Sequence, residues 1–182
     1  HLEPALSVIL NIDADHLDYF KTLENIIRSF HQFALQTFRL LIINGDDANT
    51  RKAVEGIPSE KLLTFGFDEG NRYRAVDIAD TKRACERFTV LKDGAPLCEV
   101  SLRIPGKHNI YNALAAVAVA DYMGVDAQTI AESLHQFTGV HRRFEILGTF
   151  NGVTVADDFA HHPTELTATL NAAMHMGFRE VW

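Results

Sequence analysis

Three short apolar runs in the first third of the chain constrain its fold more than any other feature. They cover residues 5–12, 40–43 and 62–67, and a polar turn follows each of the first two. Residues 19–37 separate the first two runs and carry apolar side chains at three- and four-residue spacing, which is typical of an amphipathic helix. A short helix to about residue 54 separates the second run from the third. Strands that alternate with helices over short connections predict an α/β fold with a mostly parallel sheet and flanking helices.

The middle of the chain changes from this pattern to a period of two. Residues 87–103 alternate around the turn Lys92-Asp93-Gly94, which predicts a small antiparallel hairpin. Two helices are expected next, over residues 109–123 and 127–137.

A second unit is expected to begin near residues 139–143. Residues 144–150 and 153–156 flank Asn151-Gly152, a strong hairpin signal, and a helix is predicted from Pro163 to about Met176. We therefore expect one domain over residues 1–140 and the beginning of another over residues 141–182.

Charge and composition narrow the classes of function. Lys and Arg total 17 against 24 Asp and Glu, a formal charge of −7, and this argues against a nucleic-acid partner. Apolar runs such as 113–120 are too short to cross a membrane, and no secretory signal is visible. Cys85 and Cys98 are interpreted as reduced, buried thiols. We expect a cytoplasmic enzyme or binding domain, and the chain ends at His1 and Trp182 suggest a piece of a longer protein.

The first candidate site follows the first apolar run. Asp13, Asp15, His16 and Asp18 lie there, where the carboxyl ends of parallel strands form a ligand crevice. Carboxylates with a histidine could hold a divalent cation, directly or through water. The alternative is an acidic turn in which Asp18 starts the next helix.

The second candidate site is the start of the helix after Gly106. Asn109 and Asn112 put two amides on one helix face, and an amide suits the N6 and N7 edge of adenine. The helix N-terminus near His108 could also bind an anion. The alternative is that Asn109 only caps the helix and Asn112 is exposed to solvent.

Two further candidates lie near the expected domain boundary. A guanidinium of Arg142 or Arg143 could reach a phosphate between domains, unless the pair is a surface feature of a linker. His161 and His162 follow two acidic residues and could act as ligands or general bases, although their spacing matches no zinc signature. Neither GxxxxGK[ST] nor GxGxxG occurs in the sequence, so a nucleotide site lacks its usual anchor.

Four motifs, taken in order, resemble those of the Mur ligases of peptidoglycan synthesis. They are Asn11 to Asp18, Ile104 to Ala116, Gly139 to Phe144 and Asp157 to Glu165. The resemblance implies a central ATP-binding domain over residues 1–140, without its N-terminal phosphate loop, followed by the first elements of a Rossmann-like C-terminal domain. It also implies ATP and Mg²⁺ as cofactors.

The resemblance assigns roles to eight residues. They are His16 as a ligand of magnesium; His108, Asn109 and Asn112 around adenine; Arg143 at the γ-phosphate; Asp158 at the nucleotide; and His161 and His162 facing the new amide. Arg143, His16, His161 and His162 would form the catalytic group. Phe159 and Ala160 depart from the Tyr and Gly of many family members.

The implied reaction joins L-alanine to UDP-N-acetylmuramate through an acyl phosphate, and the isolated chain is expected to be inactive. Residues 14–19 and Glu165 look more like the alanine-adding members than like the recycling ligase that attaches a tripeptide to the same nucleotide. Outside the family, a metal-dependent hydrolase or a non-catalytic nucleotide-binding module remains open.

Overall fold

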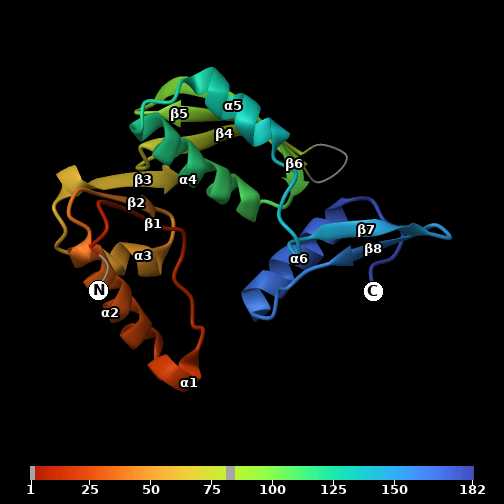
Figure 1. Ribbon diagram of the computed structural model, residues 1–182, viewed down its shortest axis with the longest axis horizontal. Coiled ribbons are helices and arrows are strands. Elements are labelled where there is room, and N and C mark those ends of the chain that lie inside the picture. Colours follow the sequence, from red (N-terminus) through yellow and green to blue (C-terminus); the bar gives the residue numbers. More distant parts are fainter. Residues whose placement is uncertain (1–2, 81–84) are drawn as a thin grey trace.

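A six-stranded sheet forms the larger part of the molecule in the computed structural model, which describes residues 3–80 and 85–182 (Figure 1). Its strands follow one another in chain order: β1 (Leu6–Ile9), β2 (Leu40–Asn44), β3 (Leu62–Gly66), β4 (Tyr73–Asp80), β5 (Cys85–Lys92) and β6 (Ala95–Pro105). The pairs from β1 to β4 are parallel, and β5 is antiparallel to both of its neighbours. The predicted α/β fold is confirmed, as is the hairpin around Asp93-Gly94.

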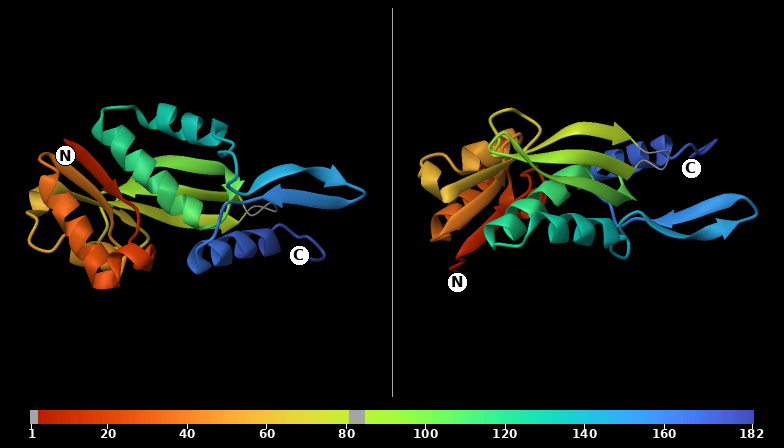
Figure 2. Two further views of the ribbon diagram at one scale, coloured as in Figure 1. Left: turned by 60° about the horizontal axis from the view of Figure 1, so that its bottom comes forward. Right: turned by 90° about the horizontal axis from the view of Figure 1, so that it is seen from above.

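Helices cover both faces of this sheet (Figure 2). The helices are α1 (Leu17–Phe20), α2 (Leu23–Gln36), α3 (Ala48–Ala53), the short 3-10 helix η1 (Ser59–Lys61), α4 (His108–Tyr122) and α5 (Ala127–Gln136). Strand β2 is buried along its whole length because Leu40 and Ile42 belong to the core under α4 and α5, while Leu41 and Ile43 belong to the core under α2 and α3. A strand with two buried faces explains the unbroken apolar run in the sequence.

Two details differ from the expectation. The helix expected from residue 19 is interrupted, because Lys21 has a φ of 70° and Thr22 caps α2 by accepting a hydrogen bond from the backbone N–H of Asn25. Asp18 lies in the first turn of the short helix α1, as the alternative expected, but His16 holds the cap position. Strand β4 was not expected; its alternation is broken by Asp77, which has a φ of 53° next to a register shift.

A smaller C-terminal part follows α5. It holds the hairpin of β7 (Glu145–Phe150) and β8 (Val153–Asp157), which turns at Asn151-Gly152, and α6 (Pro163–His175). Both were predicted. Figures 1 and 2 show the hairpin extending away from the sheet, with α6 beside it.

Two further observations concern the cysteines and the length of the helices. Cys98 is half-buried and outside any disulfide, and burial raises the pKa of its thiol, whereas the side chain of Cys85 lies outside the described residues. Over the ranges 3–80 and 85–182, no helix is both long enough and apolar enough to cross a bilayer.

Candidate functional site

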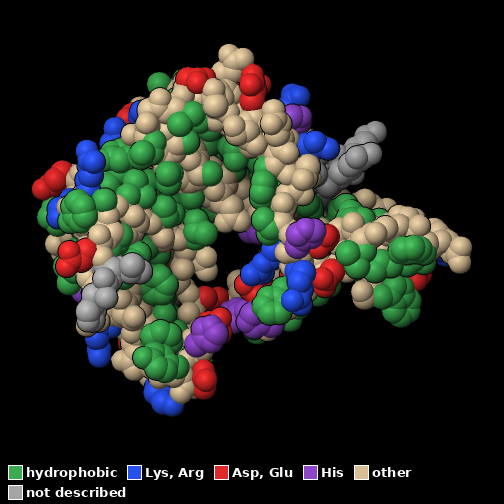
Figure 3. All heavy atoms as spheres, in the orientation of Figure 1, with side chains coloured by type: hydrophobic (Ala, Val, Ile, Leu, Met, Phe, Trp, Pro, Cys, Tyr) green, Lys and Arg blue, Asp and Glu red, His purple; other side chains and the backbone are tan. Residues whose placement is uncertain are grey.

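A cavity of about 1300 Å³ lies between the six-stranded sheet with its helices, which we call the sheet domain, and the C-terminal part. It is bordered by the loops after β1 and β2, by α4 and α5, and by the segment from Gly139 to Thr169. Figure 3 shows this hollow with charged and histidine side chains gathered along one edge. Since β1 and β2 are parallel, their carboxyl ends meet at this edge, as expected for a ligand crevice in an open α/β sheet.

Asn109 and Asn112 line the cavity from the first turns of α4. The Asn112 amide donates to the Asn109 side-chain oxygen over 3.0 Å, and the Asn109 amide donates to the Pro105 carbonyl over 2.7 Å. The two amides therefore share one helix face, as predicted. The interpretation of Asn109 as the cap is wrong because Lys107 holds that position, whereas Asn112 is exposed, as the alternative expected. The Asn112 oxygen and one N–H of each amide lie outside these two bonds and could meet a base edge.

His108 folds back over Gly106 at the mouth of the cavity. Gly106 has a φ of 102°, and a Cβ there would lie 2.6 Å from Cε1 of His108, so two constraints favour glycine at this position. Burial lowers the pKa of His108; the charge of Asp158 opposes this shift and that of Arg143 adds to it. The imidazole is therefore favoured in its neutral form.

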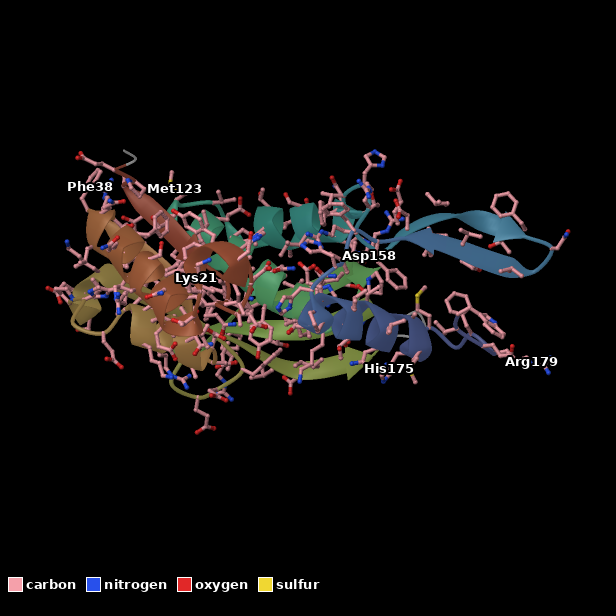
Figure 4. The ribbon with its side chains drawn as sticks, turned by 90° about the horizontal axis from the view of Figure 1, so that it is seen from below. Lys21, Phe38, Met123, Asp158, His175 and Arg179 are labelled. Atoms are coloured by element: carbon pink, nitrogen blue, oxygen red, sulfur yellow. The ribbon has the colours of Figure 1, made fainter. Side chains whose placement is uncertain are left out.

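Arg143 and Asp158 reach the same cavity from the C-terminal part. Arg143 lies 3.5 Å from the Glu165 carboxylate. The Asp158 carboxylate accepts hydrogen bonds from the Phe144 amide and from the Thr169 hydroxyl, each over 3.0 Å, so it joins the connecting segment to α6. Figure 4 shows Asp158 where the β7–β8 hairpin meets the rest of the molecule.

The two adjacent arginines have different surroundings. The guanidinium of Arg142 lies 4.3 Å from the centre of the Phe159 ring and 3.6 Å from the Asp157 carboxylate. Arg142 is not among the residues that line the cavity, whereas Arg143 is. Both side chains are more than half exposed, as a surface pair would be, but only Arg143 also lines the cavity, and its role at a phosphate stays a prediction.

His16 and Asp13 represent the predicted magnesium site. The His16 side chain is 71% exposed, lies 3.7 Å from the Asp15 carboxylate and does not line the cavity, whereas Asp13 does. Within the described residues, no three His, Cys, Asp or Glu side chains converge as a metal cluster. Magnesium usually takes one or two protein carboxylates together with phosphate oxygens and water, so the Asp13 carboxylate fits an ion shared with a nucleotide, and the ligand role of His16 stays a prediction.

His161 and His162 differ in exposure and partners. The His161 side chain is 60% exposed, and its Nδ1 lies 3.1 Å from the Phe159 carbonyl oxygen. The His162 side chain is 18% exposed, and its Nε2 lies 3.0 Å from the Ala14 carbonyl oxygen of the sheet domain. A catalytic role for either histidine stays a prediction.

Asp46 and Tyr111 also line the cavity, and sequence reasoning missed both. The Asp46 carboxylate accepts from the Tyr111 hydroxyl over 3.1 Å, from the Asn71 amide over 2.6 Å and from the Phe67 backbone N–H over 2.6 Å. Burial and the Asp46 charge raise the pKa of Tyr111, which keeps the hydroxyl protonated as the donor. Their positions in the sequence could have identified them, because Asp46 follows β2 as Asp13 follows β1, and Tyr111 directly precedes Asn112.

Two family models match the chain. The model of the Mur ligase middle domain matches residues 1–120, and the model described as "Mur ligase, glutamate ligase domain" matches residues 142–182.

Among curated proteins, similar relatives are named UDP-N-acetylmuramate–L-alanine ligase. That of Caldanaerobacter subterraneus subsp. tengcongensis is 44% identical over 98% of this chain and 39% of its own length, and that of Agathobacter rectalis is 43% identical over 95% and 38%. This chain therefore spans about two fifths of the length of these relatives.

Three solved structures of ligases are also similar to this chain. The UDP-N-acetylmuramate–alanine ligase MurC of Thermotoga maritima is 31% identical with a TM-score of 0.78, covering 96% of this chain and 39% of that one. A murein peptide ligase of Psychrobacter arcticus is 28% identical with a TM-score of 0.70, over 94% and 35%. MurF of Acinetobacter baumannii is 26% identical with a TM-score of 0.83, over 95% and 38%.

Proposed function

This chain belongs to the Mur ligase family, and from that premise we propose that the protein containing it joins L-alanine to UDP-N-acetylmuramate at the expense of ATP, in the cytoplasm. The observation that carries the proposal is the cavity, in which Asn109 and Asn112 of one part face Arg143 and Asp158 of the other. The names of the curated relatives support L-alanine as the added group. We assign residues 1–140 to the ATP-binding domain and 141–182 to the beginning of a Rossmann-like domain.

The proposed reaction forms an amide from a carboxylate and an amine. ATP supplies a phosphoryl group to the muramate carboxylate, and the amine of L-alanine then displaces that phosphate. Arg143 provides a planar guanidinium that can hold phosphate oxygens in two hydrogen bonds and offset their negative charge. Glu165, 3.5 Å away, holds this side chain at the cavity before the phosphate arrives.

The adenine end of the nucleotide is assigned to α4. Asn109 and Asn112 offer N–H donors and an oxygen acceptor on one face of this helix. His108 directly precedes Asn109, and its lowered pKa favours the neutral imidazole. It therefore places no positive charge next to the uncharged base.

Asp13 and His16 in the loop after β1 would hold Mg²⁺, which would neutralise phosphate charge when bound. Asp13 is suited to this position because its pKa is lowered, chiefly by the hydrogen bond from Thr164, so the carboxylate stays ionised.

Neither histidine lines the cavity, and of the two, His161 has the ring nitrogen that could take up the amine proton. Its Nδ1 faces the Phe159 carbonyl oxygen and must carry the hydrogen, so in the neutral ring Nε2 has a lone pair. His162 is engaged differently, because its Nε2 faces the Ala14 carbonyl oxygen and must donate to it.

A substrate comparison with the full-length protein tests the proposal. Phosphate release from ATP and Mg²⁺ is measured with UDP-N-acetylmuramate and either L-alanine or the tripeptide L-alanyl-γ-D-glutamyl-diaminopimelate. Turnover with L-alanine is expected. Turnover with the tripeptide but not with L-alanine would assign the protein to the recycling ligases. Binding of ADP without turnover of either substrate would indicate a nucleotide-binding module, and hydrolysis of the nucleotide substrate without ATP would indicate a hydrolase.

A further inference from the structure

Two hydrogen bonds connect the N-terminal end of α6 to the loop after β1, although about 150 residues separate them in the sequence. The Thr164 hydroxyl donates to Oδ2 of Asp13 over 2.7 Å. Nε2 of His162 lies 3.0 Å from the carbonyl oxygen of Ala14. We call these four residues, Asp13, Ala14, His162 and Thr164, the clasp.

The partners of His162 fix its tautomer. The carbonyl of Ala14 can only accept, so Nε2 carries the hydrogen and donates it. Nδ1 then accepts from the Thr164 backbone N–H over 3.3 Å and caps α6. The same imidazole therefore terminates the helix and holds the helix end against the sheet domain.

The Asp13 carboxylate also accepts hydrogen bonds on both of its oxygens. The Asp13 carboxylate accepts from the Thr164 hydroxyl through one oxygen and from the Ala14 backbone N–H, over 2.7 Å, through the other. A hydrogen bond to an ionised acceptor is stronger than one between neutral groups.

The clasp lies next to the charged groups of the candidate site. Glu165 directly follows Thr164 and holds Arg143, and all three line the cavity together with Asp13. Farther along α6, Ala172 is buried close to Gly106, because a Cβ built on that glycine would lie 3.5 Å from the Ala172 methyl group. Among the residues that the structure describes, helix α6 thus approaches the sheet domain at the clasp, through polar groups, and at Gly106, through the Ala172 methyl group.

We propose that Thr164 and His162 are positioning residues that hold α6 on the loop after β1, so that Arg143 and Asp13 face the same phosphates. The catalytic part of this inference depends on the proposed ligase function. The association of the two parts does not depend on it, and it can be measured in the 182-residue chain.

Backbone hydrogen exchange in this chain tests the clasp without any activity assay. Thr164→Val removes the hydroxyl at nearly constant volume, whereas Thr164→Ser keeps it. Thr167→Val is a matched control, because the Thr167 hydroxyl donates to the Pro163 carbonyl within the same helix. Thr164→Val is expected to speed exchange in residues 13–20 about tenfold, with Thr164→Ser and Thr167→Val close to the original chain. Unchanged exchange in Thr164→Val, with folding verified by circular dichroism, would overturn the clasp.

Turnover by the full-length protein tests the positioning role. Thr164→Val is expected to lower kcat about tenfold, the effect of one charge-assisted hydrogen bond, and Thr164→Ser is expected to recover most of it. Faster exchange with an unchanged kcat would show that the clasp exists but does not position the site. If the original full-length protein has no ligase activity, the proposed function fails, while the exchange experiment still decides whether the clasp joins the two parts.

Discussion

Arg143 reaches the cavity from the C-terminal part, whereas its neighbour Arg142 packs on Phe159 outside the cavity. Residue type and spacing are therefore insufficient to identify the functional member of this pair. The contacts of each side chain separate the two members, and they supply matched controls for substitutions.

Arg143→Ala in the full-length protein is expected to lower kcat on the order of 100-fold, because it removes a charge partner of the transferred phosphate. Arg142→Ala is the control, since its guanidinium lies against Phe159, and a change in kcat of less than about threefold is expected. Steady-state phosphate release measures both. An unchanged kcat in Arg143→Ala would remove this residue from the mechanism.

Asn112→Ala is expected to raise the Kd for ADP about tenfold, because it removes the amide that shares the α4 face with Asn109. Isothermal titration calorimetry on the chain measures this constant. Gln128→Ala serves as the control, since this exposed amide on α5 donates to Glu132. Equal affinities for the two variants would place adenine elsewhere.

At the scale of elements, the loops after the parallel strands are held by specific polar contacts. The Asp46 carboxylate connects the loop after β2 to the segment after β3 through the Phe67 N–H and the Asn71 amide. It also reaches α4 through the Tyr111 hydroxyl. These contacts place the first turns of α4, which carry the predicted adenine residues, at the carboxyl edge of the sheet.

Gly66→Ala is expected to lower the free energy of unfolding by about 1–3 kcal/mol, because a Cβ there would lie 2.4 Å from the Asp46 carboxylate oxygen and displace it. Gly70→Ala is the control: a Cβ at this position has no described atom within 4 Å, and a change within about 0.5 kcal/mol is expected. Urea unfolding followed by circular dichroism compares the two. Equal stabilities would show that Asp46 can move at no cost.

At the scale of the whole molecule, charges from one part act on the pKa of a residue in the other, in addition to the larger effect of burial. Burial lowers the pKa of His108 on α4, and the charges of Asp158 and Arg143, from the C-terminal part, act on it in opposite directions. The sign of the effect on stability follows from linkage. The unfolded chain binds a proton at His108 near pH 6.5 and the folded chain does so only at lower pH, so this residue destabilises the fold as pH falls below about 6.5.

His108→Asn is therefore expected to reduce the loss of stability between pH 7.5 and pH 5.5. Urea unfolding midpoints of the two proteins, measured at both pH values, give the difference directly. Comparing the variant with the original chain cancels the contribution of the other histidines. If the free energy of unfolding falls by the same amount in both proteins over this range, His108 has the same pKa in the folded and unfolded states.

The sequence by itself determined most of the elements and their order. Apolar runs with two buried faces predicted β1 to β3, a period of two predicted the β5–β6 hairpin, and Asn151-Gly152 predicted the turn between β7 and β8, because each of these signals is local. Strand β4 escaped detection because the bulge at Asp77 interrupts its alternation. The motifs also predicted the family, which the family models show.

Only the tertiary structure decided which polar side chains meet. The contact of Asp13 with Thr164 and that of Asp46 with Tyr111 each join segments far apart in the chain. No local pattern encodes such pairs, because the partner of a polar group depends on how strands and helices pack rather than on its neighbours in the sequence. For the same reason, the structure alone showed that Arg143 lines the cavity and Arg142 does not.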